Sequence, residues 1–549
     1  MGGAASHPAQ GDSRVVQTKY GAVIGRRFKF NDKEVDAFQG IPFAKPPLGE
    51  LRFKKSVPPE PWEGVKETKA FGPRGIQKES YYDRIKYGKT SEDNLYLNVF
   101  TPVWGPELPK GFSVLVFVHG GGFVGDGAVK YGDSNICEHL CTKDVVVVTI
   151  QYRLGYLGFF TTGDAVCPGN FALWDQTMAL QWVQDNISAF NGNPNSVTVM
   201  GQSAGGASVD ILSLSPHSRD LFHQVIPMAG NASCSWGTDN DMVERCRKFA
   251  ETQGILDFFD SEAMIAKLRQ LPESKFELSM HESLAKSNST ALCAVAPRVD
   301  GDFIPKPIRE LRKEAVVKPM LIGCCDMEGI FMTFGRHPSL SGLMEEIAKL
   351  VPEEDHPSNF KKLRRGIFQK VLKDEDITNQ EAIVRAYTEI MGDLFTNIGV
   401  QQTVLETLEA HHAPIFLYSF NYFNPKSWGP LGMKMLFKAA THCTELGYIF
   451  GVGIIWNYDF NDDDKKMLEL TTKLWTNFVK YGNPNGVAND VILSSSEKAL
   501  RWEPATITNP QRHLSISLDS EMREEYKNSR PLLIVETRMK RNMQVYALE

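Results

Sequence analysis

The stretch that decides the fold is Val197-Thr198-Val199-Met200-Gly201-Gln202-Ser203-Ala204-Gly205-Gly206. Its first four residues favour a strand, and the next five have the pattern Gly-x-Ser-x-Gly. In that pattern the serine lies on a strained turn between a strand and a helix, where small neighbours are needed because a Cβ would collide with the backbone. A serine hydroxyl is a poor nucleophile at neutral pH, so Ser203 would require a histidine base, an orienting acid and an oxyanion hole.

A glycine run supplies the predicted oxyanion hole. Residues 114–118, Val-Leu-Val-Phe-Val, predict a buried strand, and His119-Gly120-Gly121-Gly122-Phe123 follows it directly. Without side chains in the way, the backbone N–H groups of Gly121 and Gly122 can turn toward that of Ala204, just after the serine. We expect these three donors to hold the oxyanion of a tetrahedral acyl intermediate.

The base and the acid are expected downstream of Ser203, because the chain order in this class of turn is serine, acid, histidine. Among the twelve histidines, His442 is the best placed, in a small and polar context after a strand predicted at residues 415–420. Three others are interpreted as surface or packing residues: His411, His412 and His513. The acid should follow the strand-like residues 321–323, and both Asp326 and Glu328 fit that spacing.

Short buried-type strands alternate with helical patterns along the chain, which predicts an α/β fold with a mostly parallel central sheet flanked by helices. Residues 15–27 and 34–43 predict the strands of a small N-terminal sheet. Further predicted elements are strands at 145–150, 225–228, 320–322 and 415–420 and a helix at 175–188. Residues 1–14 are predicted to be a flexible tail and residues 15–549 a single domain, with helix-rich insertions at 257–318 and 338–397 forming a cap.

Composition excludes several classes of protein. The 549 residues are 42% hydrophobic and 23% charged, with a net charge of −6, which fits a globular protein with a large core. No apolar stretch approaches the ~18–20 residues that a membrane-spanning helix needs. The one dense basic run, residues 361–365, is interpreted as a solvated helix face, so no nucleic-acid partner is predicted. No metal site and no cofactor are predicted.

Cysteine usage and the first residues predict a cytoplasmic protein. The nine cysteines are an odd number without CxxC spacing, which indicates reduced thiols, and residues 1–14 lack the apolar core of a signal peptide. Met1-Gly2-Gly3-Ala4-Ala5-Ser6 fits the pattern for N-myristoylation at Gly2. One acyl chain without a neighbouring polybasic patch would give only weak, reversible association with a membrane surface.

Many ordered motifs identify the chain as similar to the type-B carboxylesterase and cholinesterase family, in the α/β-hydrolase superfamily, from about residue 15 to about residue 518. The shared motifs, besides the glycine run and the serine turn, are Phe38-Gln39-Gly40-Ile41-Pro42-Phe43-Ala44, Leu51-Arg52-Phe53, Ser91-Glu92-Asp93-Asn94-Leu95-Tyr96-Leu97-Asn98, Tyr152-Arg153-Leu154-Gly155, Asp175-Gln176, Glu328-Gly329, His442 with Glu445-Leu446, and Gly482-Asn483-Pro484. The resemblance implies that Glu328 is the acid and Asp326 a neighbour. It also implies that Glu92 and Asp93 are structural.

Several departures from the family pattern carry information. Gly75 and Asn94 stand where secreted members carry one disulfide, and the second usual pair aligns near Ile255 and Lys267. The residue before the nucleophile is usually glutamate in the family but is Gln202 here, and residues 72–90 lack the tryptophan with which cholinesterases hold a quaternary ammonium. The resemblance therefore implies neutral esters rather than choline esters as substrates.

Two functions of different classes are weighed. The first is a serine carboxylic-ester hydrolase that acts on a small-molecule ester through Ser203, His442 and Glu328 and an acyl-enzyme intermediate. The second is a non-catalytic, neuroligin-like interaction protein on the same fold. The retention of every polar element of the predicted site favours the enzyme.

Overall fold

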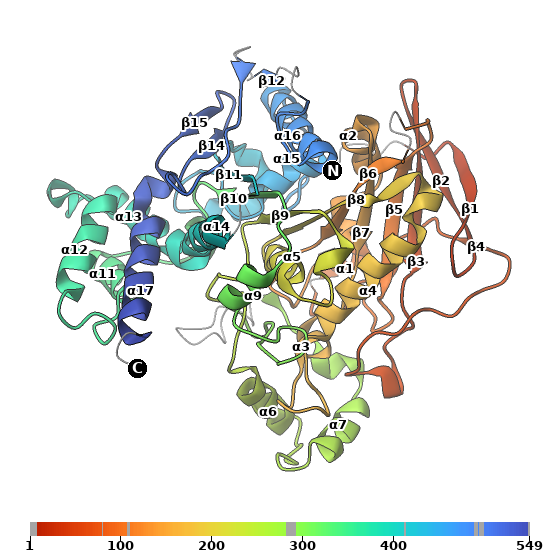
Figure 1. Cartoon of the computed structure of the whole chain (residues 1–549), viewed down its shortest axis with the longest axis horizontal. Helices are drawn as coiled ribbons and strands as arrows, with labels where there is room; N and C mark the ends of the chain where they lie inside the picture. The colour runs from red at the N-terminus through yellow and green to blue at the C-terminus, as the bar shows by residue number, and fades with distance from the viewer. Residues whose placement is uncertain are drawn as a thin grey trace.

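One sheet of 13 strands runs through the molecule (Figure 1). The computed structural model describes residues 8–79, 81–106, 110–280, 293–410, 413–487, 492–493 and 499–546. The sheet comprises β1 Gly11–Gln17, β2 Ala22–Phe30, β3 Lys33–Pro42, β4 Val65–Glu67, β5 Tyr96–Pro102, β6 Phe112–Val118, β7 Val145–Ile150, β8 Gly192–Gln202, β9 Gln224–Met228, β10 Met320–Cys325, β11 Ile415–Phe420, β14 His513–Ile516 and β15 Glu521–Arg523. A separate pair consists of β12 Ile492–Leu493 and β13 Ala499–Leu500.

The middle of the sheet is parallel, which confirms the predicted fold class. Strands β7, β6, β8, β9, β10, β11 and β14 lie side by side in that order, each parallel to the next. Their β-branched and aromatic residues are almost fully buried, as expected for strands that are covered on both faces. Because these strands run the same way, the turns after β6, β8 and β10 meet at one edge of the sheet.

Helices cover both faces of this sheet, and the side chains of β6 alternate between them. Val114, Val116 and Val118 join a core with α4 and α5, whereas Leu115 and Phe117 join a core with α16. The helices are α1 Tyr81–Tyr87, α2 Ser134–His139, α3 Gly155–Phe159, α4 Phe171–Asn186, α5 Ala204–Leu214, α6 Met242–Thr252, α7 Ser261–Arg269, α9 Ile308–Glu314, α10 Gly329–Met332, α11 Leu340–Leu350, α12 Phe360–Val371, α13 Gln380–Gly392, α14 Ile398–Ala410, α15 Gly447–Phe450, α16 Asp462–Tyr481 and α17 Arg530–Tyr546.

The N-terminal strands correct one prediction. They do not form a small sheet of their own, because β3 pairs with β5 and β5 with β7, so β1 to β3 extend the main sheet. Strand β1 also begins at Gly11 and pairs with β2, so residues 11–14 belong to the sheet rather than to a flexible tail. The segment predicted at 34–43 matches β3, whereas the one predicted at 15–27 covers the end of β1, the turn at 18–21 and the first part of β2. Their place in the main sheet depends on partners that are distant in sequence.

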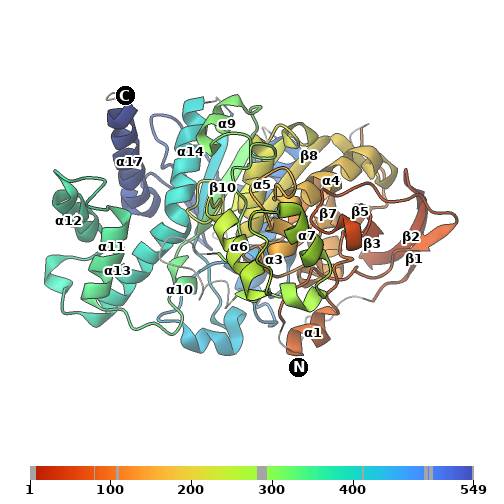
Figure 2. The ribbon, with the colours of Figure 1, turned by 90° about the horizontal axis from the view of Figure 1, so that it is seen from below.

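The two helix-rich insertions occupy different places (Figures 1 and 2). Helix α7, in the first, packs into the core on the α4–α5 face, whereas α11, α12 and α13, in the second, pack with α17 into a cluster of their own beside the sheet. Each insertion nevertheless contributes a residue to one cavity: Leu278 from the first and Phe395 from the second. Within the described ranges, no helix combines the length and the apolar character that crossing a bilayer needs.

Candidate active site

Ser203 lies alone between the end of β8 and the start of α5, with φ 58° and ψ −125°. This positive φ is rare for a residue with a side chain, and the crowding around the turn explains its glycines. A Cβ on Gly201 would lie 2.3 Å from the carbonyl oxygen of Gly205, and one on Gly205 would lie 2.1 Å from that of Val118. The sequence folds into this turn because only glycine fits at these positions.

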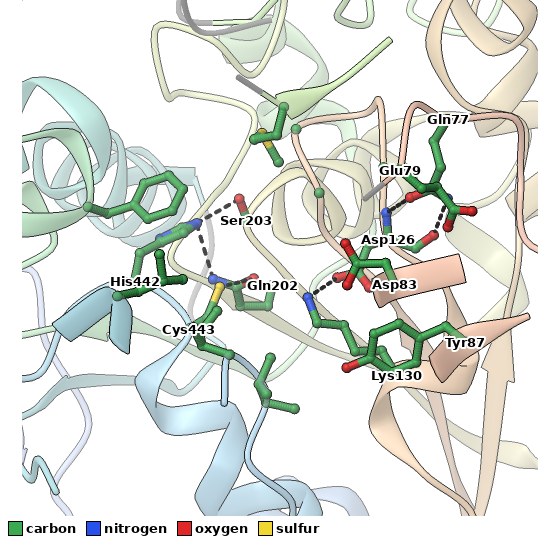
Figure 3. Close-up of a pocket in the computed structure, with 18 of the residues that line it drawn as sticks. Gln77, Glu79, Asp83, Tyr87, Asp126, Lys130, Gln202, Ser203, His442 and Cys443 are labelled. Atoms are coloured by element: carbon green, nitrogen blue, oxygen red, sulfur yellow. Dashed lines mark hydrogen bonds and ion pairs between the residues drawn. The ribbon is translucent and has the colours of Figure 1, made fainter. Parts of the chain in front are cut away.

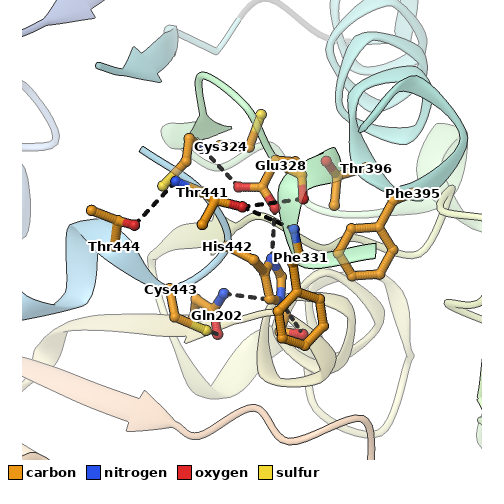
Figure 4. Close-up of polar contacts among 12 residues, drawn as sticks. Gln202, Cys324, Glu328, Phe331, Phe395, Thr396, Thr441, His442, Cys443 and Thr444 are labelled. Carbon is orange, nitrogen blue, oxygen red and sulfur yellow. Dashed lines mark hydrogen bonds and ion pairs between the residues drawn. The ribbon is translucent and has the colours of Figure 1, made fainter. Parts of the chain in front are cut away.

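Ser203, His442 and Glu328 form one chain of hydrogen bonds (Figures 3 and 4). The Nε2 atom of His442 lies 2.8 Å from Ser203 Oγ, and its Nδ1 atom lies 2.6 Å from Glu328 Oε2. All three side chains are buried, and Ser203, the most exposed, shows 8% of its surface. The rings of Phe331 and Phe395 pack against the imidazole, with centroids 5.1 and 4.9 Å away. This arrangement can move a proton from the serine to an imidazole that a carboxylate holds in place.

The loop after β10 separates the two candidate acids. Glu328 points to His442, and its other oxygen, Oε1, accepts a hydrogen bond of 2.8 Å from the backbone N–H of Cys325. Asp326 instead forms an ion pair with Lys527, with Nζ 3.3 Å from Oδ1. Of the two candidates, Glu328 contacts the imidazole and Asp326 contacts Lys527 instead.

His513, another candidate histidine, does not join these hydrogen bonds. His513 lies in β14, where its Nδ1 atom is 2.9 Å from the carbonyl oxygen of Gln511 and its ring packs edge-on against Tyr526. Burial lowers the pKa of His513 to about 4, so it is neutral at physiological pH. His411 and His412 lie outside the described residues.

The glycine run lies beside Ser203. Gly121 and Gly122 both have positive φ, 97° and 57°, which glycine adopts without strain. Within the described ranges, no backbone carbonyl accepts from either of their N–H groups, and Ala204 contributes an unpaired N–H as the first residue of α5. The imidazole of His119 is held behind the run by Tyr152, whose ring stacks on it and whose hydroxyl donates to the His119 carbonyl.

A cavity of about 640 Å³ opens onto Ser203 and His442. Its apolar side is formed by Trp236, Leu278, Met280, Cys293, Phe331 and Phe395. Its polar side is formed by Arg74 and by five residues that Figure 3 labels: Gln77, Glu79, Asp83, Asp126 and Lys130. No cluster of three or more histidine, cysteine or acidic side chains that could hold a metal occurs in the described part of the chain.

The family model described as the carboxylesterase family matches residues 12–533. The chain belongs to the carboxylesterase family. Its relatives include the esterase cest-33 of Caenorhabditis elegans, 40% identical over 96% of this chain and 95% of that protein. A medium-chain fatty acyl-CoA hydrolase precursor of Anas platyrhynchos is 35% identical over 86% and 85%, and a juvenile hormone esterase of Tribolium castaneum 34% over 92% and 87%. This carboxylesterase is therefore a serine hydrolase of the α/β-hydrolase superfamily, and the family supports ester hydrolysis.

In this carboxylesterase, Gln202 stands next to the serine and touches the histidine. Its Nε2 atom lies 3.3 Å from His442 Nε2, and its Oε1 atom accepts a hydrogen bond of 3.3 Å from the thiol of Cys443 (Figure 4). Gln202 is 1% exposed, so a glutamate here would place a buried negative charge beside the histidine. The replacement of the family's usual glutamate by Gln202 thus changes a residue that contacts His442.

Three residues around the acid loop escaped the sequence analysis as site residues. Cys325 links two buried carboxylates, because its N–H donates to Glu328 and its thiol donates to Glu445 Oε2 over 2.8 Å. Lys527 donates to the carbonyl oxygens of Cys325 and Asp326 over 3.1 and 2.8 Å, and so holds the end of β10. Lys527 is about 200 residues from this loop, and no local pattern could have signalled the contact.

The carboxyl group of Glu445 has an unusual protonation equilibrium. Burial, together with the nearby charge of Glu328, raises the pKa of Glu445 to about 7. The two buried carboxyl groups therefore differ in their hydrogen-bond partners and in their protonation. Glu328 hydrogen-bonds the imidazole of His442, whereas Glu445 accepts from the thiol of Cys325 and is protonated over much of the acidic range.

Proposed function

We propose that this protein hydrolyses neutral carboxylic esters through Ser203 as nucleophile, His442 as base and Glu328 as the acid that orients it. The observation that carries the proposal is the buried, continuous chain of hydrogen bonds from Ser203 Oγ through His442 to Glu328, at the floor of a cavity. A non-catalytic interaction protein would gain nothing from this buried polar chain, and the relatives are named as esterases and hydrolases.

The proposed reaction has two halves. Ser203 Oγ attacks the ester carbonyl while His442 Nε2 takes the hydroxyl proton, and the tetrahedral oxyanion accepts hydrogen bonds from the N–H groups of Gly121, Gly122 and Ala204. Collapse expels the alcohol, which receives the proton from His442 and leaves an acyl-serine. Water then attacks the acyl group with His442 again as base, which releases the acid and restores Ser203.

Substitution of the nucleophile and of its base tests the proposal. Ser203→Ala and His442→Ala should each reduce the turnover of p-nitrophenyl butyrate by several orders of magnitude and to a similar extent, because each removes the same acylation step. Ser203→Ala should also lose labelling by a fluorophosphonate probe. Ser213→Ala, a buried serine on the far end of α5, is the matched control and should keep both properties. Near wild-type turnover by a folded Ser203→Ala protein would refute the mechanism.

The polar side of the cavity supports neutral rather than cationic esters. Gln202 brings no charge, and two carboxylates of that side are already paired with the protein's own cations, Glu79 with Arg74 and Asp126 with Lys130. Tyr87 is an aromatic residue of the 72–90 segment that lines the cavity, but its ring already faces the protein's own cations, Arg74 at 5.6 Å and Lys86 at 4.7 Å. A quaternary ammonium would have to displace them. We expect kcat/KM for a neutral butyrate ester to exceed that for butyrylthiocholine widely, and comparable values would contradict the assignment.

We also propose that the enzyme works in a reducing compartment, the cytoplasm. All nine cysteines are free. Gly75 and Asn94 occupy the positions of the family's first disulfide. A Cβ on Gly75 would lie 3.0 Å from the side-chain nitrogen, Nδ2, of Asn94, so the two positions are adjacent but hold no thiols. Three Asn-x-Ser/Thr sequons occur, at Asn186, Asn231 and Asn288. The side chains of Asn186 and Asn231 are buried and could not carry a glycan, and Asn288 lies outside the described residues. Fractionation of tagged protein from its native cells is the check.

The proposed N-myristoylation at Gly2, with weak association to a membrane surface, concerns a residue outside the described ranges. Its support is the sequence pattern of residues 1–6. Mass spectrometry of the native N-terminal peptide decides it: an acylated Gly2 is expected, and a free or acetylated glycine would remove the proposal.

A further inference from the structure

The mouth of the cavity carries an unusual combination of charges and apolar side chains. Residues 421–458 form a large part of its border and contain three lysines but a single acidic residue, Glu445, which is buried. The three lysines, Lys426, Lys434 and Lys438, are all exposed. The exposed Asp459 follows directly, so the connection between β11 and α16 carries three exposed lysines and one exposed carboxylate in a chain whose net charge is −6.

The apolar side chains here alternate sharply between buried and exposed. In the 3-10 helix η9, Pro425–Lys434, and just after it, Trp428 and Met435 are buried beneath the segment and join a small core with Ile330. Leu431 and Met433, between them, point outward and are 46% and 83% exposed. Buried anchors therefore hold the segment in place, while Leu431 and Met433 keep a large part of their apolar surface exposed.

Trp456 continues the same lip. A Cβ on Gly429 would lie 2.4 Å from the Trp456 ring, so the indole packs flat against the backbone of η9, yet it remains 42% exposed. Both Leu431 and Trp456 line the cavity. The exposed apolar surface is thus continuous with the entrance to Ser203 rather than being a scattered feature of the surface.

Helix α1 forms the opposite lip, since Asp83, Lys86 and Tyr87 line the same cavity. Ile85 on this helix is 67% exposed, and its neighbours Arg84 and Lys86 are also exposed. Figure 2 shows α1 at the same lower border of the molecule as the light-blue segment after β11 that contains η9. Apolar and basic side chains therefore occur on both sides of the opening.

We propose that this mouth surface, made of Ile85, Leu431, Met433, Trp456, Lys426, Lys434 and Lys438, docks on an anionic lipid surface and turns the cavity toward it. Exposed apolar side chains insert at the headgroup boundary, and lysines around them are attracted to anionic headgroups. A second copy of the chain fits less well, because a two-fold contact through this surface would bring its lysines against each other. Docking in this way lets a water-insoluble ester enter the cavity without crossing water. The docking step is independent of the catalytic roles proposed above.

Vesicle binding tests the proposal directly. The full chain, produced in bacteria with an unmodified Gly2, is sedimented with vesicles of phosphatidylcholine alone or of phosphatidylcholine with phosphatidylserine. We expect binding to the mixed vesicles that weakens with added salt, and little binding to phosphatidylcholine alone. Met433→Asp and Lys434→Glu should each weaken this binding by about five-fold or more.

Matched controls lie at the opposite edge of the sheet. Ile507 is exposed and follows Ala505, which pairs with Ile415 at the start of β11, and Lys313 lies near the end of α9, before the start of β10. Ile507→Asp likewise replaces an exposed apolar side chain by a carboxylate, and Lys313→Glu makes the same charge reversal, so both should bind like wild type. Met433 and Lys434 do not line the cavity, so Met433→Asp and Lys434→Glu should hydrolyse soluble p-nitrophenyl butyrate at the wild-type rate.

Three results would overturn the proposal. These are equal binding to both kinds of vesicle, an equal loss in the mouth and control variants, and a dimer in sedimentation velocity that Met433→Asp dissociates, which would assign the surface to a second copy. We expect Ser203→Ala to lose turnover and to bind vesicles like wild type. Vesicle binding therefore tests the docking surface, and turnover separately tests the proposed function.

Discussion

At the scale of single residues, the two carboxyl groups after β10 make different contacts. Glu328 hydrogen-bonds His442, whereas Asp326 pairs with Lys527. A carboxylate on the imidazole fixes its tautomer and stabilises the imidazolium, so Glu328→Gln should lower kcat by about 10²–10⁴-fold. Asp326→Asn, the matched control, should have a small effect. Steady-state kinetics with p-nitrophenyl butyrate, on variants whose circular dichroism matches wild type, give the ranking, and the reverse order would show that the acid is misassigned.

Glu445 predicts a pH dependence of stability. Its pKa in the folded protein is raised to about 7, above the usual value of a glutamate in an unfolded chain, so the folded state binds the proton more tightly. This contribution to stability is complete at low pH and is lost as the pH rises through about 7. Glu445→Gln removes it, and the variant should lose less Tm than wild type between about pH 5 and about pH 8.

Thermal unfolding across this range is the measurement, with the exposed Glu262→Gln as the control that should follow wild type. The substitution itself shifts Tm by a constant amount at every pH. Once that amount is subtracted, the curves of Tm against pH for wild type and Glu445→Gln should coincide at low pH, and wild type should fall below the variant as the pH rises through about 7. Parallel curves throughout would mean that Glu445 titrates normally.

At the scale of elements, the packing of α5 against β6 depends on a glycine. A Cβ on Gly205 would lie 2.1 Å from the carbonyl oxygen of Val118, and neither backbone can move without displacing its element. Gly205→Ala should therefore destabilise the fold by about 1–3 kcal/mol or more, because it overpacks a close backbone contact. Gly366, inside α12, has open space around its Cα, so Gly366→Ala should stabilise by about 0.5–1 kcal/mol. Opposite shifts in Tm are the expected outcome, and an unchanged or raised Tm for Gly205→Ala would show that the glycine at the turn is not needed for packing.

At the scale of the whole molecule, the fold is held by its cores without covalent cross-links. All nine cysteines are free, and eight of them are buried. Removing a native disulfide typically costs about 2–5 kcal/mol, so a protein that relied on one would melt earlier when reduced. We expect the same Tm with and without dithiothreitol, measured by differential scanning calorimetry. A lower Tm under reduction would reveal a disulfide in the solution state.

The serine turn, the strands and the candidate histidine were predictable because their signals are local. β-branched runs mark β6 and β7 by their composition, and the glycines around Ser203 report backbone crowding at their own positions. The approximate bounds were correct for the same reason: the helix predicted at residues 175–188 overlaps α4, Phe171–Asn186, and ends in the following 3-10 turn, Ile187–Phe190. Family resemblance, rather than spacing, favoured Glu328 over Asp326.

The sequence by itself determined a mostly parallel α/β sheet and a serine at the carboxyl end of one strand, since both depend on patterns within a few residues. Only the tertiary structure decided that β1 to β3 extend the main sheet, that Lys527 holds the loop of Glu328, and that an apolar, cationic lip borders the cavity. These features join residues that lie tens to hundreds of positions apart. Their contacts depend on strand order and on how the loops pack, and no local periodicity encodes either.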